Sequence, residues 1–279
     1  KTTYTVTATH GSPGSGGSGT GYVNNSGVAS NFSSAGEYAC ILVDSNDNLH
    51  ISHHGGLAGD DSLLYSTDAS GTWNTIILDK YNNPGVGNVG RYSSMAIASD
   101  DSLHISYVDV SNYYLKYATN SGGSWATYTI DNSGDVNHDS SIEVDSNNNV
   151  HILYFDKTNL TLKYITDASG SWVSTVVDSR SYAGYTNSLT IDSNDNLRAA
   201  YTTGYWGDKL IYAEYSNGAW TNSTIDEGRY RHTSITVDSN DNVHISYQNQ
   251  PSSNPASLKY ATDVSGSWVN TTLDQGRAG

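Results

Sequence analysis

The sequence has little cysteine and little basic charge. Its single cysteine, Cys40, excludes an intrachain disulfide, so the fold must be stabilised by its packed core. With 13 basic against 28 acidic residues the net charge is −15, a sign that repels phosphate backbones and argues against nucleic acid as a partner. The sequence also lacks the run of about 18 apolar residues needed for a membrane span, and it lacks a sustained helical period.

The sequence is instead rich in residues that favour strands and turns. It has 22 tyrosines and 27 glycines, and serine, threonine and asparagine are abundant. Such a composition suits short strands joined by many tight turns. Together with the acidic charge, it predicts an all-β protein that is secreted or displayed at the cell surface.

Five similar segments follow one another from residue 37 onward. The last of them reads VDSNDNVHISY, LKYATDVSGSW and VNTTLD, separated by variable stretches. A marker column in these segments has successive spacings of 54, 47, 47 and 46 residues and contains His50, His104, His151, Arg198 and His244. Self-similarity at this period is typical of propellers and other repeat folds.

Each segment predicts four strands. A first strand such as SSIEV or TSITV is followed by the DSNDN turn, the HISY strand, the LKYAT strand and a last strand that ends in aspartate. We therefore expect an all-β, five-bladed β-propeller of four-stranded antiparallel blades over residues 37–279. Its repeats cover about 37–79, 91–131, 138–178, 185–226 and 231–274. We expect four repeated tryptophans to be largely buried between blades, namely Trp73, Trp125, Trp172 and Trp268.

Residues 1–36 lie outside the five repeats. TYTVTA resembles a last strand without its tryptophan, and GSPGSGGSGTG has the composition of a flexible linker. We expect an N-terminal strand that closes the ring or adds an outer strand, followed by a Gly/Ser-rich loop. The final residues QGRAG resemble the approach to another repeat, as in DEGRYRHTS, which is consistent with a segment of a longer repeat-bearing protein.

The turn before each tryptophan resembles the Asp-box, also called the bacterial neuraminidase repeat, whose pattern is Ser-x-Asp-x-Gly-x-Thr-Trp. The first segment reads STDASGTW from Ser66 to Trp73, with its glycine one place late, and asparagine or tyrosine replaces the aspartate at Asn120 and Tyr215. The resemblance covers nearly the whole sequence from residue 37 and implies a sialidase-type β-propeller. It implies fold rather than activity, because Asp-boxes are turns remote from catalytic centres and the sialidase catalytic residues are not identifiable here.

Two repeated polar features are interpreted as structural. The histidines of the marker column recur in four segments, and a residue that nearly every blade repeats reports the fold more than the function. The DSNDN turns, beginning at Asp44, Asp192 and Asp238, resemble part of a calcium loop, but the distant bidentate acid of such a loop is not identifiable. We expect no cofactor and no metal ligands, and the acidic surface leaves weak Ca²⁺ binding open.

Departures from the repeat are better candidates for a functional site. They fall just before the first strand and just after the second strand of each repeat, and these connections share one face of a propeller. The candidates are Arg91, Tyr92, His138, Tyr185, Tyr205, Trp206, Arg231, His232, His53 and His54. Aromatic side chains stack on sugar rings, and arginine and histidine pair with carboxylates.

Three functions remain open on this evidence. The favoured one is an extracellular, non-catalytic and lectin-like carbohydrate-binding module, because no catalytic carboxylate pair is identifiable. The second is a lyase or glycosidase that acts on an acidic polysaccharide through the histidine, tyrosine and arginine cluster. The third is a structural or adhesive role in a surface protein. The sequence predicts neither the identity of the ligand nor the oligomeric state.

Overall fold

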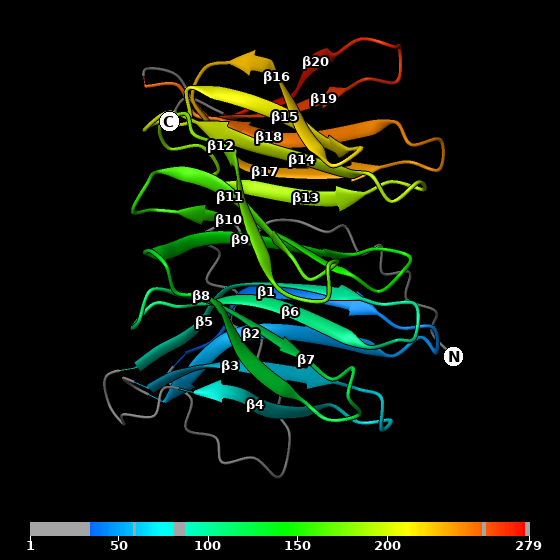
Figure 1. Cartoon of the computed structure of the whole chain (residues 1–279). Helices are drawn as coiled ribbons and strands as arrows, with labels where there is room; N and C mark the ends of the chain where they lie inside the picture. Colours follow the sequence, from blue (N-terminus) through cyan, green and yellow to red (C-terminus); the bar gives the residue numbers. More distant parts are fainter. Residues whose placement is uncertain (1–33, 58–59, 81–86, 253–254, 277–279) are drawn as a thin grey trace.

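The structure, a computed structural model, describes residues 34–57, 60–80, 87–252 and 255–276 (Figure 1). These residues form twenty β-strands and contain no helix, which confirms the all-β class. No helix that could cross a membrane is present in this part of the chain. The strand and Gly/Ser-rich loop predicted for residues 1–36 lie, up to residue 33, outside the described residues.

Consecutive strands pair antiparallel into four-stranded meanders, as the repeats predict. The first and second meanders comprise β1 (Ser34–Val43), β2 (Leu49–Leu57), β3 (Asp60–Thr67), β4 (Asn74–Lys80), β5 (Gly87–Ile97), β6 (Leu103–Asp109), β7 (Tyr114–Thr119) and β8 (Ala126–Asp131). The third and fourth comprise β9 (Val136–Val144), β10 (Val150–Asp156), β11 (Thr161–Thr166), β12 (Val173–Asp178), β13 (Asn187–Ile191), β14 (Leu197–Thr203), β15 (Lys209–Ser216) and β16 (Ala219–Glu227). The fifth comprises β17 (Tyr230–Val237), β18 (Val243–Asn249), β19 (Ser257–Thr262) and β20 (Val269–Gln275).

The first two meanders are not separate sheets. β3 pairs in parallel with β5 through Asp60 opposite Gly87 and Asp61 opposite Asn88, so β1 to β8 form one eight-stranded sheet. The other three meanders are four-stranded sheets of their own. The structure therefore confirms four-stranded antiparallel units, and their interpretation as five blades stays a prediction.

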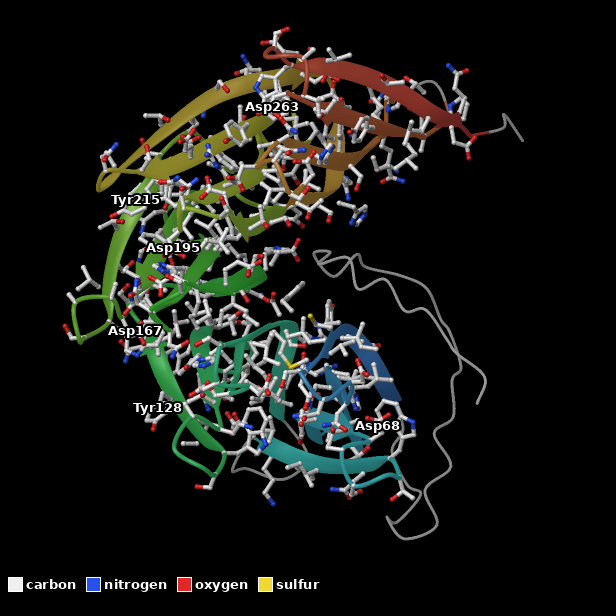
Figure 2. The ribbon with its side chains drawn as sticks, turned by 90° about the vertical axis from the view of Figure 1, so that its right-hand side faces the viewer. Asp68, Tyr128, Asp167, Asp195, Tyr215 and Asp263 are labelled. Atoms are coloured by element: carbon white, nitrogen blue, oxygen red, sulfur yellow. The ribbon has the colours of Figure 1, made fainter. Side chains whose placement is uncertain are left out.

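The meanders follow one another along an arc (Figure 2). Their first strands β1, β5, β9, β13 and β17 contact in succession, and their fourth strands are largely exposed. Four apolar clusters occupy the interfaces between neighbouring meanders, each built from residues of two successive repeats. Burial between repeats, rather than within one repeat, therefore supplies the core.

A tyrosine and a tryptophan meet at every interface between meanders. Tyr65 packs on Trp125 with ring centroids 4.9 Å apart, and the same pair recurs as Tyr117 with Trp172, Tyr164 with Trp220, and Tyr212 with Trp268, at 5.0 to 5.5 Å. Trp73, Trp125, Trp172 and Trp268 are each partly buried, in keeping with the prediction that most of their surface is covered. The turn that holds each tryptophan lies at the outer rim, so one face of the indole packs on the tyrosine while the rest contacts solvent.

An aspartate at the end of each fourth strand contacts the next meander. Asp131 accepts hydrogen bonds from Tyr154 and from Lys163, the latter at 2.7 Å. Asp79 and Asp226 have the same tyrosine and lysine partners, and Asp178 pairs with Tyr201 and with Arg180, because Ile211 replaces the lysine in that repeat. In all four cases a tyrosine hydroxyl joins two repeats, and in three of them a lysine of the next repeat adds an ion pair, whereas Arg180 lies only two residues after Asp178.

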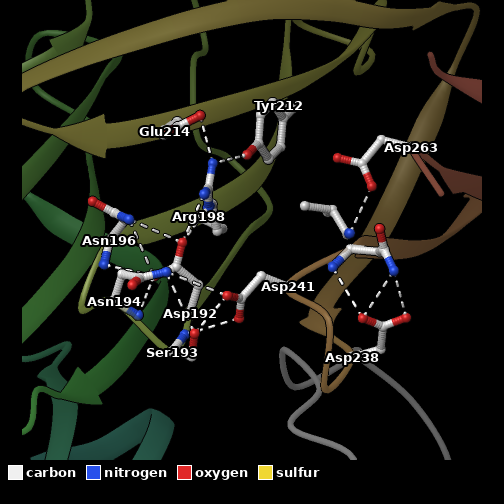
Figure 3. Close-up of polar contacts among 12 residues, drawn as sticks. Asp192, Ser193, Asn194, Asn196, Arg198, Tyr212, Glu214, Asp238, Asp241 and Asp263 are labelled. Atoms are coloured by element: carbon white, nitrogen blue, oxygen red, sulfur yellow. Dashed lines mark hydrogen bonds and ion pairs between the residues drawn. The ribbon is translucent and has the colours of Figure 1, made fainter. Parts of the chain in front are cut away.

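The histidines of the marker column share one contact, because each lies against a tyrosine hydroxyl of the third strand. The Nδ1 atom of His151 lies 2.6 Å from the Tyr164 hydroxyl, its Nε2 atom lies 3.3 Å from Asp145, and His50 repeats both contacts. In the fourth meander Arg198 takes this place and binds Asp192, Tyr212 and Glu214 (Figure 3). The histidines therefore join the DSNDN turn to the third strand.

Candidate functional site

The connections before the first strand and after the second strand of a meander lie together, and we call their surface the loop face. Backbone hydrogen bonds join them: Gly204 donates to Ser181, Gln250 donates to Arg229, and Lys157 donates to Asp135, at 2.7 to 2.8 Å. Side chains from different repeats can therefore meet on one surface.

β-Bulges in the first strands of two meanders reorient the candidate residues beside them. The register between β5 and β6 shifts between Arg91 and Ser94, and the register between β17 and β18 shifts between Arg231 and Ser234. Tyr92 and His232 take positive φ values of 55° and 52° there, a conformation that is uncommon for residues other than glycine. Such strain recurs at binding sites, because a bulge re-aims the side chains beside it.

Aromatic rings form a series along the loop face. Tyr38 contacts Tyr92 at 4.6 Å, Tyr92 contacts His138 at 5.7 Å, and His138 contacts Tyr185 at 4.0 Å between ring centroids. These residues come from four successive meanders. The structure therefore brings together three of the predicted residues, Tyr92, His138 and Tyr185.

A cavity of about 120 Å³ continues this series at the fourth and fifth meanders. Four predicted residues line it, namely Tyr185, Tyr205, Trp206 and Arg231, together with Tyr182, Thr186, Thr202, Gly207 and Tyr230. Ligand pockets for drug-sized molecules usually exceed roughly 300 Å³, so this cavity suits one small group such as a single sugar ring or its carboxylate.

The exposed pair Tyr205 and Trp206 occupies the tip of a tight turn between β14 and β15. Gly207 has a positive φ of 73°, and a side chain there would collide with the Tyr230 carbonyl oxygen. The Arg229 guanidinium lies over the Trp206 ring at 4.6 Å, and its Nε atom is buried without a hydrogen-bond partner among the described residues. Sequence reasoning missed Arg229, although it stands in the same run, EGRYR, as Arg231.

Burial keeps the titratable groups of this surface neutral. It lowers the pKa of His138 to about 4, with a further contribution from the nearby Lys157 charge. Burial also raises the pKa of Asp139, which follows His138 on β9, to about 8. At neutral pH the imidazole of His138 can therefore accept a proton, while the carboxyl group of Asp139 is mostly protonated.

The remaining predicted residues lie elsewhere. His54 is buried between Glu37, Asp61 and Asn88, and His53 contacts Ser66 at 3.1 Å on the opposite side of β2. The Arg91 guanidinium lies over the Tyr38 ring at 5.9 Å, whereas Arg231 lines the cavity at the fourth and fifth meanders. His232 is half-buried beside Arg231, and burial lowers its pKa. Arg91 and Arg231 therefore contact different parts of the loop face.

A second cavity, of about 350 Å³, lies at the outer rim between the third and fourth meanders. Tyr164, Tyr215 and Trp220 line it, and none of its lining residues is charged. The fourth repeat lacks the Asp-box turn here: Asn217 and Gly218 join β15 to β16, so Tyr215 pairs directly with Trp220 and both rings line the cavity.

The described residues contain no cluster of three or more histidine, cysteine, aspartate or glutamate side chains that could hold a metal ion. The carboxylate of each DSNDN turn is used by the turn itself. Asp44 accepts backbone hydrogen bonds from Asn46 and Asn48 at 2.8 to 2.9 Å and also contacts His50. These contacts explain the conserved spacing of the motif within this sequence without a cation.

Comparison with known proteins supports the fold and leaves the family open. No family model matches this sequence, and no curated protein matches it. Solved structures do match: a protein of unknown function from Dyadobacter fermentans has a TM-score of 0.59 and 12% identity, with coverage of 85% of this chain and 82% of that one.

Two further structures have assigned functions. The Aleuria aurantia lectin, in complex with Fucalpha1-6GlcNAc, has a TM-score of 0.54 and 16% identity over 86% of this chain and 79% of the lectin. A Trypanosoma rangeli sialidase has a TM-score of 0.55 and 11% identity over 86% of this chain and 48% of the sialidase. At such identities the likeness shows a shared fold, in agreement with the predicted sialidase-type architecture.

Proposed function

We propose that the five meanders are blades of a β-propeller module, and that this module binds carbohydrate on its loop face as a secreted or cell-surface protein. The observation that carries the proposal is the 120 Å³ cavity, which gathers Tyr185, Tyr205, Trp206 and Arg231 from separate connections. Trp206 and Tyr205 are 49% and 64% exposed and contact each other with ring centroids 4.8 Å apart, so together they offer a contiguous aromatic surface to a ligand.

The cavity combines the two groups that an acidic sugar requires. Exposed rings stack on the apolar face of a pyranose, and a guanidinium pairs with its carboxylate. Arg231 lies at the cavity and Arg229 lies beside it, in a protein with only 13 basic residues. Neighbouring structures of the same fold include a lectin, which agrees with this use of the scaffold.

The proposal is tested by calorimetric titration with two probes of equal length, an oligogalacturonate and a neutral maltooligosaccharide. Arg231→Ala should weaken binding of the oligogalacturonate at least tenfold, because the carboxylate loses its partner. Trp206→Ala should weaken binding of any probe that the parent binds, because the stacking surface is removed. Trp220→Ala is the matched control, since it removes an aromatic ring of the rim cavity and leaves the loop face unchanged.

The proposal fails if the parent binds neither probe, or if both loop-face variants bind as the parent does. Circular dichroism must show that each variant keeps the parent's fold. Loss of binding in Trp220→Ala alone would move the site to the rim cavity.

A second candidate function is polysaccharide lysis. The close contact of His138 with Tyr185, and the position of Tyr185 beside Arg231, favour it. In this reaction a base removes the proton next to a uronate carboxyl group, and the leaving oxygen of the glycosidic bond takes up a proton, which leaves a carbon–carbon double bond. Ultraviolet absorbance of that product distinguishes lysis from binding, and His138→Ala should abolish it.

A further inference from the structure

The fifth meander exposes a face that the other four bury. Leu63, Leu115, Leu162 and Leu210 occupy one position of the third strand and are all 0% exposed, because each packs toward the following meander. Leu258 has the same position, opposite Asp274, and is 45% exposed. Leu273 is 58% exposed, whereas Ile225 at its position in the fourth meander is 8% exposed.

The polar contacts of this face are also incomplete. Asp131 and its counterparts each contact a tyrosine and a basic side chain, whereas the Asp274 side chain makes no hydrogen bond or ion pair among the described residues. The serine of each DSNDN turn likewise binds an aspartate or asparagine of the following turn: Ser146 donates to Asp195 at 3.0 Å, and Ser193 donates to Asp241 at 2.9 Å. Figure 3 draws the second of these contacts.

The first meander does not carry the complementary groups. The positions of Tyr107 and Lys116 are occupied there by His53 and Leu64. His53 instead contacts Ser66 at 3.1 Å, where the other repeats have alanine or isoleucine. The first repeat is thus atypical, as a terminal repeat is, whereas the fifth has every feature of an interior repeat.

The backbone hydrogen bond that follows the last strand of the fourth meander recurs after the last strand of the fifth. After β16, Gly228 donates a hydrogen bond to Asp208 at 3.0 Å, and the chain continues into the next meander. After β20, Gly276 donates to Ala256 at 2.8 Å, at the corresponding position. The last described residues after β20 therefore repeat the backbone contact that follows β16.

From these observations we infer that the face formed by Leu258, Leu273 and Asp274 is a docking surface for a further four-stranded repeat, one that carries tyrosine and lysine at the positions of Tyr107 and Lys116. Such a repeat would cover both leucines and supply the hydroxyl and the ammonium group for Asp274. The first meander, either by ring closure or from a second copy, is a poorer occupant because Leu64 would leave the aspartate buried without a cation.

The test extends the full chain: residues 1–274 are followed by a second copy of residues 227–279, which brings its own tyrosine, lysine and tryptophan. We expect one cooperative thermal transition with a Tm above that of the parent. Asp274→Asn should lower the Tm of the extended chain as much as Asp226→Asn lowers the Tm of the parent, and it should leave the parent's Tm unchanged. A control extension with Tyr247→His and Lys259→Leu in the added copy should lose the gain in Tm.

Three results would overturn the inference. The added repeat could unfold in a separate transition, or the control extension could be as stable as the first. Asp274→Asn could lower the parent's Tm, which would mean that the face is already covered. Light scattering would then assign the occupant, because a monomer implies closure onto the first meander and a concentration-dependent dimer implies a second copy.

Discussion

Replacing Asp131 with alanine is expected to lower the free energy of unfolding by about 3 kcal/mol, since breaking a buried ion pair leaves its partners uncompensated. The Asp131 and Lys163 side chains are only 8% and 13% exposed, and the Tyr154 hydroxyl would lose the same acceptor. Urea denaturation followed by circular dichroism measures the change.

The matched control is Asp274→Ala, at the same position of the fifth meander. Because Asp274 lies on a fully exposed strand, this variant should change stability by less than about 0.5 kcal/mol. A loss below about 1 kcal/mol in Asp131→Ala would show that the contact between meanders does not hold the repeats together.

Acid should weaken the same contact. Burial acts to raise the pKa of Asp131, but hydrogen bonds from Lys163, Ser133 and Tyr154 outweigh it and hold the pKa at about 2. Since the folded pKa lies below its ordinary value, the stabilisation is present above about pH 4 and is lost as the pH falls toward 2. The difference between Asp131→Ala and the parent should shrink over that range.

Asp139→Asn is expected to stabilise the protein in mild alkali. Burial raises the pKa of Asp139 from 3.8 to about 8, so the folded state holds a proton that the unfolded state has already released. The parent therefore loses stability as the pH rises from about 4 to 8, and an asparagine, which cannot ionise, avoids that loss. The variant should exceed the parent by on the order of 5 kcal/mol at pH 8 and equal it at pH 4.

Unfolding by urea at the two pH values measures this difference. If the difference in free energy of unfolding between the variant and the parent were the same at pH 4 and pH 8, Asp139 would be ionised in the folded protein. Such a result would also remove the protonated carboxyl group from the surface next to His138.

The strand order could be predicted because each repeat carries its own turn chemistry. The DSNDN and Asp-box turns both bond their own backbone, with Asn46 N–H donating to the Asp44 carboxylate and Gly71 N–H donating to the Asp68 carbonyl oxygen, so they mark where strands begin and end without any tertiary information. The parallel contact of β3 with β5 could not be predicted, since it depends on how two connections of the first repeats approach each other in space.

The candidate site was predictable only in part. The sequence pointed to the loop face through residues that break the repeat, and the structure brings Tyr185, Tyr205, Trp206 and Arg231 to one cavity. The sequence did not indicate that Arg91 lies apart from Arg231, because the repeat pattern does not specify distances around the arc. Nor did it reveal the rim cavity, which arises from a hairpin that is tighter than the Asp-box turn.

The most direct test of the central claim is fluorine NMR of protein labelled with 5-fluorotryptophan. The six tryptophans should give six resonances, and Trp206→Phe assigns the one from the loop face. Titration with an oligogalacturonate should shift the Trp206 resonance and leave the five half-buried tryptophans between repeats unchanged. A shift of the Trp220 resonance with none at Trp206 would contradict a carbohydrate site on the loop face.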